Sequence, residues 1–234
     1  MSSISESDVH ATASGREPLP GSGRLTLLLI AGIPVTVILA ATWMWYFVAR
    51  GDLDLVGALG TANKGELVQP PRQAEDAGWQ NAEGAAFGAG ASGTQGRGRW
   101  TFVIPQRNGE CAAACEQRLF ETRQIHMSLG KDLGRVDRLL VTPAEELSLT
   151  VASLSDGRPV PENFRAYLAS EQRGLSTWRS DATRFDAMFP ELSSNPNSWY
   201  LMDPAGWVMM RYDPTVDYKD VISDLKFLIK NSNG

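Results

Sequence analysis

The sequence has very few residues that bind soft metals. It contains only two cysteines, Cys111 and Cys115, and two histidines, His10 and His126. This supply excludes a metal site rich in histidine and cysteine. No Ser/His/Asp or Cys/His arrangement is apparent either, because one histidine lies in the N-terminal tail and the other on a predicted helix face. A hydrolase of those kinds is therefore not expected.

The sequence also lacks any block of like charge. Its formal net charge is −5, and 43% of its residues are hydrophobic, which is ordinary for a globular chain. Nothing in this balance favours a nucleic-acid partner, and none is expected. A length of 234 residues suits one domain together with an anchor and a linker.

One long stretch, residues 25–49, contains no charged side chain. As a helix it is ~37 Å long at ~1.5 Å per residue, which exceeds the ~30 Å of a hydrocarbon core. Trp43, Trp45 and Tyr46 cluster at one end, where amphipathic rings sit at a membrane interface. The sequence therefore predicts a single transmembrane helix over residues 25–49.

Two alternatives to this anchor remain open. A buried helix of a soluble protein is apolar on all sides, and a cleaved signal peptide has an apolar core of roughly 7–15 residues. The stretch is long and ends in bulky aromatic residues, which favours an anchor. Arg16 and Arg24 precede it and Arg50 follows it, a slight positive-inside bias. We expect residues 1–24 to be a cytoplasmic tail and the C-terminal domain to lie in the periplasm, on a bacterial inner (plasma) membrane.

Residues 50–99 are expected to form a linker and an edge segment. Residues 84–98 are rich in glycine, which is typical of flexible chain. Residues 61–72 are more structured in character and could lie along the edge of the domain. The compact domain is expected to span residues 100–234.

The pattern of the domain is strand, helix, strand, helices, hairpin, helix. The expected strands are 100–104, 138–142, 199–202 and 207–210, and the expected helices are 111–129, 162–171, 181–189 and 216–230. Asp203, Pro204 and Gly206 give the hairpin the chemistry of a type I turn. This order predicts an α/β fold of the thioredoxin-like class.

The cysteine pair is the one motif that carries chemistry. Cys111 and Cys115 lie where a predicted strand ends and a helix begins, and the N-terminal end of a helix favours a thiolate. Residues four apart on a helix have Cα atoms ~6 Å apart, within the range of a disulfide. Glu110 and Glu116 flank the pair and oppose a thiolate. The pair can be a structural disulfide or buried thiols, a redox pair with Cys111 attacking and Cys115 resolving, or a metal-binding pair.

Several stretches resemble known proteins. Residues 100–104, 111–115 and 200–206, with the closing helix, resemble the Sco (SenC) family. That family consists of membrane-anchored thioredoxin-like proteins that deliver copper or reduce thiols in cytochrome c oxidase assembly. A closer resemblance is to small bacterial inner-membrane proteins that accompany oxidase assembly factors. It involves residues 65–72, 115–119, 123–124, 129–132 and 135–136.

The chain departs from the Sco pattern at the metal site. Its cysteines are separated by three alanines rather than prolines, and residues 194–197 lack the histidine that Sco proteins use for copper. His126 lies ~16 Å along the helix from Cys115, too far to replace it. Met202, Met209 and Met210 are soft ligands, but methionine on a strand usually packs in the core.

The resemblance implies a membrane-tethered factor of cytochrome c oxidase assembly that acts through Cys111 and Cys115. The pair would exchange thiols and disulfides or hold Cu(I) transiently, with no cofactor required. Partners would be the membrane and oxidase subunits or other assembly factors. The alternative is a non-catalytic extracytoplasmic scaffolding module with a structural disulfide.

Overall fold

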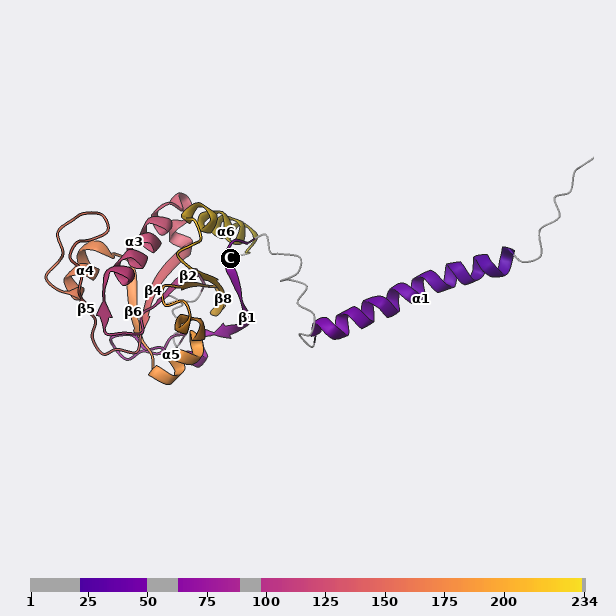
Figure 1. Ribbon diagram of the computed structural model, residues 1–234, viewed down its shortest axis with the longest axis horizontal. Helices are drawn as coiled ribbons and strands as arrows, with labels where there is room; N and C mark the ends of the chain where they lie inside the picture. Colours follow the sequence, from indigo (N-terminus) through magenta and orange to yellow (C-terminus); the bar gives the residue numbers. More distant parts are fainter. Residues whose placement is uncertain (1–21, 50–62, 89–97, 233–234) are drawn as a thin grey trace, which may run out of the picture. The chain divides into compact units, whose positions relative to one another are not determined.

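The computed structural model describes residues 22–49, 63–88 and 98–232 (Figure 1). Their contacts divide the chain into two compact units, Met1–Thr61 and Ala62–Gly234. Most of the expected cytoplasmic tail and parts of the expected linker lie outside the described residues. Each unit is taken by itself.

The described part of the first unit is a helix, α1, Ser22–Ala49. Its segment Thr26–Phe47 has a mean hydropathy of 2.2. Two hydroxyl groups along it are satisfied within the helix: Thr36 Oγ1 donates to Ile33 O at 2.9 Å, and Thr42 Oγ1 donates to Ile38 O at 2.8 Å. Internal pairing of this kind suits a helix in hydrocarbon. The expectation of a helix long and apolar enough to cross a membrane is confirmed.

The second unit is built on a six-stranded sheet with strand order β1-β8-β7-β2-β4-β6. The strands are β1 Glu66–Gln73, β2 Trp100–Pro105, β4 Val136–Thr142, β6 Leu175–Arg179, β7 Trp199–Met202 and β8 Trp207–Tyr212. β2, β4 and β6 run parallel, whereas β7, β8 and β1 pair antiparallel with their neighbours. The expected mixed α/β architecture is confirmed.

Helices cover both faces of the sheet. α3 Ala113–Met127, α4 Phe164–Glu171 and α6 Tyr218–Asn231 contribute to one core, and α5 Ala182–Met188 and the 3-10 helix η1 Ala74–Ala77 contribute to the other. Because successive strand residues point to opposite faces, β2 serves both cores. Phe102 and Ile104 lie in the first, and Val103 lies in the second.

The hairpin follows the chemistry of its turn. Gly206 N donates to Asp203 O at 3.0 Å, and the Asp203 side chain accepts from Ala205 N and Trp207 N. Gly206 has a φ of 90°, a conformation that a residue with a Cβ rarely adopts. The predicted turn between β7 and β8 is confirmed.

Four features of the second unit differ from the expectations. β6 was not predicted, and neither was the two-stranded sheet of β3, Glu110–Cys111, with β5, Ser148–Leu149. α3 begins at Ala113 rather than at Cys111 because β3 pairing holds that cysteine in extended backbone. Residues 61–72, which could lie along the edge of the domain, include most of the edge strand β1, whereas Trp79 and Phe87, in the expected linker, are buried core side chains. The compact unit is therefore larger than residues 100–234.

A buried carboxylate fixes the first described residues of this unit. Asp224 on α6 accepts from Lys64 N at 2.9 Å, from Gly65 N at 3.0 Å and from the Tyr212 hydroxyl at 3.1 Å. Burial, with the Asp224 charge next in size, raises the pKa of Tyr212 above its ordinary range. One side chain thus joins α6, β8 and the residues that precede β1.

Asp224→Ala should destabilise the domain by about 3 kcal/mol, because two N–H groups and a phenol lose their acceptor. The free energy of unfolding can be measured in urea by tryptophan fluorescence. Ser223→Ala, an exposed change on the same helix, is the matched control and should stay within about 0.5 kcal/mol of wild type. Equal stability of Asp224→Ala and the control would contradict this account.

Candidate functional site

The two predicted site residues are joined by a disulfide. Cys111 ends β3 and Cys115 lies in the first turn of α3, with their Cα atoms 5.1 Å apart. Neither cysteine is free. The structure thus brings together the pair that the sequence singled out, at a junction between a strand and a helix.

Local pairing explains this geometry. Cys111 lies opposite Leu149 of β5, and its carbonyl accepts from Thr150 N at 3.1 Å. α3 then starts after Ala112, whose side chain makes no capping hydrogen bond. The first turn therefore presents backbone N–H groups without a side-chain acceptor at the cap. In a reduced pair, this end of the helix favours the thiolate form.

Both cysteines are buried. Cys111 is 0% exposed and Cys115 is 4% exposed, and they belong to the same apolar cluster as Leu119, Leu154 and Phe164. A thiolate must reach a sulfur atom in line to exchange with it. Exchange at this disulfide therefore requires a local opening of the surrounding chain.

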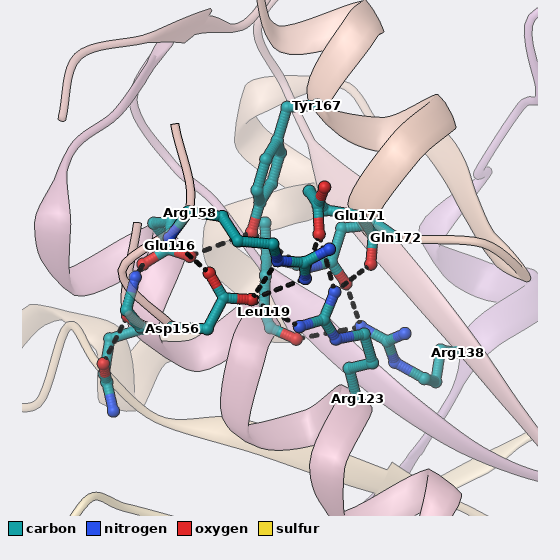
Figure 2. A network of polar contacts seen from close by, with 11 residues as sticks. Glu116, Leu119, Arg123, Arg138, Asp156, Arg158, Tyr167, Glu171 and Gln172 are labelled. Atoms are coloured by element: carbon teal, nitrogen blue, oxygen red, sulfur yellow. Dashed lines mark hydrogen bonds and ion pairs between the residues drawn. The ribbon is translucent and has the colours of Figure 1, made fainter. Parts of the chain in front are cut away.

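A polar network holds the loop that passes over the start of α3 (Figure 2). This β5–α4 loop comprises residues 150–163. Glu116, the residue after Cys115, accepts from Ser155 N at 3.1 Å, from the Ser155 hydroxyl and from the Tyr167 hydroxyl at 3.4 Å. Leu154, next to Ser155, is buried in the cluster that contains the cysteines. The loop is thus fixed beside Cys115 by one apolar and several polar contacts.

Arginine and carboxylate side chains complete this network (Figure 2). Arg123 on α3 contacts Asp156 at 3.3 Å and Glu171 at 3.2 Å, and Arg158 contacts the same two carboxylates. A hydrogen bond from the Arg158 side chain is the largest cause that lowers the pKa of Asp156, to about 2. Alternating charges therefore bind the β5–α4 loop to α3 and α4.

Arg138 is the most deeply buried cation of this region. It lies on β4 and donates to Leu119 O at 3.0 Å and to Gln172 Oε1 at 2.6 Å. Gln172 in turn donates to the Tyr167 hydroxyl at 2.8 Å. Burial lowers the pKa of Arg138 to about 10 and raises that of Tyr167 above its ordinary range. Sequence reasoning missed these hydrogen bonds, because no local pattern distinguishes a buried arginine from an exposed one.

Among the described residues, the cysteine pair has no third metal ligand beside it. No group of three His, Cys, Asp or Glu residues that could hold a metal occurs in the part of the chain that the structure describes. His126 is held by backbone instead: its Nε2–H donates to Val136 O at 2.8 Å, with Leu133 O at 3.1 Å. Burial is the largest effect on the pKa of His126 and lowers it. Met202 and Met210 are fully buried, in the cores on opposite faces of the sheet.

Two thiolates remain as the donor set for a metal. They suit Cu(I), which accepts soft sulfur ligands at low coordination number. In this structure the two sulfur atoms are bonded to each other. The disulfide must therefore be reduced before the pair could bind an ion.

The sheet order and the cysteine-bearing junction define a thioredoxin-like domain, and the chain also carries a helix fit to span a membrane. A family model described as a transmembrane-like, thioredoxin-like, C-terminal domain matches residues 100–232. The chain belongs to this family.

Several solved structures are similar to the chain, and they include Sco proteins, which the sequence resembles. Yeast Sco1 with copper bound is 14% identical with a TM-score of 0.46, covering 74% of this chain and 96% of that one. ScoI of Bradyrhizobium japonicum with copper bound is 18% identical with a TM-score of 0.42, covering 70% and 98%. BsSco is 14% identical with a TM-score of 0.45, covering 74% of this chain and 99% of that one. It is described as having a disulfide switch and as a member of the Sco family of cytochrome c oxidase assembly proteins. Similarities of this size do not transfer a function. No curated protein matches the chain.

Asp156 should make the free energy of unfolding of the domain depend on pH in the acidic range. Its folded pKa is lowered from 3.8 to about 2, so its contribution is complete above about pH 3.8 and is lost as the pH falls through about 2. Asp156→Asn should therefore be less stable than wild type near neutral pH, and the gap should close on acidification. Urea unfolding between pH 6 and about pH 2 measures the gap. A gap that is constant over this range would contradict the pKa shift.

Proposed function

We propose that this protein is a membrane-tethered thioredoxin-like factor that acts in cytochrome c oxidase assembly through Cys111 and Cys115. The observation that carries the redox part of the proposal is the disulfide at the start of α3, in a domain of the thioredoxin-like class. The link to the oxidase rests on the stretches of sequence that resemble Sco proteins. The pair exchanges thiols and disulfides or holds Cu(I) transiently.

The exchange reaction has two steps. The Cys111 thiolate attacks a disulfide of the partner, a mixed disulfide forms, and one partner sulfur leaves as a thiolate. Cys115 then attacks the sulfur of Cys111 and releases the second partner thiol. Two electrons pass to the partner, and the intramolecular disulfide seen here is the oxidised product. Because Cys111 is fully buried, its attack requires the surrounding chain to open locally.

Copper handling would use the reduced pair. Two thiolates four residues apart can bind one Cu(I), and no third protein ligand is at hand among the described residues. A two-coordinate site of this kind suits an ion that is passed on rather than retained.

Burial of both cysteines favours a second candidate, a non-catalytic extracytoplasmic scaffolding module with a structural disulfide. The size of the closed loop weighs against it. On the chain-entropy estimate, a bridge between residues four apart stabilises the fold by only about 2 kcal/mol, less than bridges that close long loops. We favour the exchanging pair for this reason.

The orientation and partners follow the same proposal. Residues 1–24 lie in the cytoplasm and the domain lies in the periplasm, where an oxidising environment lets the disulfide persist. Oxidase subunits or other assembly factors are the partners of the pair.

Replacing either cysteine should impair oxidase assembly. Cys111→Ser and Cys115→Ser should each lower cytochrome c oxidase activity in membranes of the host, and Cys115→Ser should accumulate a mixed disulfide with a partner because no resolving thiol remains. Non-reducing electrophoresis detects that adduct. Met188→Ala, a core change on the face of the sheet away from the cysteines, is the control for loss of folding. Normal activity and no adduct in both cysteine variants would exclude the redox role.

The reduction potential and Cu(I) titration separate the two candidates. An exchanging pair should have a potential above roughly −300 mV, whereas structural bridges lie below it. The reduced wild type should bind one Cu(I), and Cys111→Ser/Cys115→Ser should bind none. Stoichiometric binding that survives loss of both thiols would refute the copper-handling part of the proposal.

A further inference from the structure

Arg118 is a buried guanidinium close to the cysteine pair. It follows Cys115 by three residues on α3 and is 4% exposed. Its Nη2 donates to Gln106 Oε1 at 2.7 Å and its Nη1 donates to Pro196 O at 2.5 Å. Within the described ranges it has no carboxylate partner, and its Nε has no hydrogen-bond partner. A charge buried against neutral acceptors is costly, so these contacts are expected to serve a purpose.

Gln106 extends the contact to the backbone at Cys111. This side chain, just after β2, is also buried, and its Nε2 donates to Glu110 O at 2.8 Å. That carbonyl belongs to the peptide bond that leads into Cys111. A chain of hydrogen bonds therefore runs from Arg118, on the helix that carries Cys115, through Gln106 to the strand that carries Cys111.

Within the described residues, the other hydrogen bonds of that strand run to β5 and to Thr150, which follows β5. β3 is two residues long, and its sheet pairing is confined to β5. Its position relative to α3 in the oxidised protein is fixed by the disulfide itself. Once the disulfide is reduced, the two cysteine segments are still joined by the chain at Ala112 and by the side-chain link through Gln106.

We propose that Arg118 and Gln106 are positioning residues that keep the two thiols of the reduced pair within bonding distance and so set its thiol–disulfide equilibrium. The inference deepens the proposed function and rests on it for its biological meaning. Two groups held near one another have a high effective concentration, which favours closure of the ring. Loosening the link therefore makes the disulfide easier to reduce.

The direction in which the thiol–disulfide equilibrium shifts distinguishes a positioning role of Arg118 from an effect of its charge. A cation beside a reduced pair stabilises a thiolate and so favours reduction. Loss of that charge alone would make the disulfide harder to reduce, the opposite of the effect of lost positioning. Gln106→Leu breaks the link and leaves the guanidinium in place. Arg118→Lys keeps the charge but cannot bind both acceptors as a planar fork does.

The test is an equilibrium titration of the full-length protein in detergent micelles. In buffers of reduced and oxidised dithiothreitol, the reductant gives two electrons and two protons to the pair and closes its own ring. The reduced fraction is read by thiol alkylation and mass spectrometry. Gln106→Leu and Arg118→Met should each raise the equilibrium constant for reduction about tenfold, equivalent to ~30 mV, with Arg118→Lys intermediate. Because both act through one chain, the double variant should shift no further than the larger single variant.

Arg138→Met is the matched control, since it also removes a buried guanidinium bound to neutral acceptors, Leu119 O and Gln172 Oε1. It should lower the thermal stability of the domain without moving the equilibrium constant. An unchanged constant in Gln106→Leu, a shift of Arg118→Met towards the disulfide, or an equal shift in Arg138→Met would overturn the inference. The reduction potential of the wild type tests the exchange function separately. The inference concerns only the ratio of the equilibrium constant for reduction in a variant to that in the wild type.

Discussion

The second unit depends on the burial of β2 along its whole length. All six of its residues are buried, and it pairs parallel with β4 on one side and antiparallel with β7 on the other. This strand therefore joins the parallel half of the sheet to the antiparallel half. It ends at Pro105, and the chain passes directly through Gln106 to β3 and Cys111. The position of the disulfide is thus tied to the strand that both cores share.

Buried polar groups determine how the loops attach to this framework. α3 carries three such side chains. Glu116 and Arg123 bind the β5–α4 loop and α4, and Arg118 binds Gln106 and Pro196. Groups of this kind must be paired when buried, so each restricts its segment to a narrow set of positions. α3 therefore places both the cysteine pair and the chain that covers it.

The elements that the sequence predicted are those with a strong local signal. β2 is a run of aromatic and β-branched residues, the β7–β8 hairpin has its turn chemistry, and α6 has an apolar stripe. β3 and β5 are two residues long, so no periodicity can be seen in them. β6 lies at the edge of the sheet and reads Leu-Ser-Thr-Trp-Arg, with little apolar alternation. Trp79 and Phe87 were assigned to the linker of residues 50–99, and Phe87 lies in its glycine-rich part, whereas tertiary packing places both in the core.

The candidate site was predictable only in part for a similar reason. The spacing of Cys111 and Cys115 identified the pair, since closeness along the chain limits their separation in space. The burial of Arg118, Arg138 and Gln106 depends on residues far away in sequence, so no local sequence pattern predicts it.

Because the disulfide is buried, access to its sulfur atoms and the balance between disulfide and dithiol depend on different contacts. Access to the sulfur atoms depends on movement of β3 and the β5–α4 loop, which are held by β5 pairing and by Glu116 and Arg123. The balance between disulfide and dithiol depends instead on how closely the two segments stay together once the bond is open, and Arg118 and Gln106 act there. The first set of contacts governs a rate and the second an equilibrium constant. In the proposed exchange function, slow access would protect the pair from adventitious thiols, and the equilibrium constant would set how readily it exchanges with a partner.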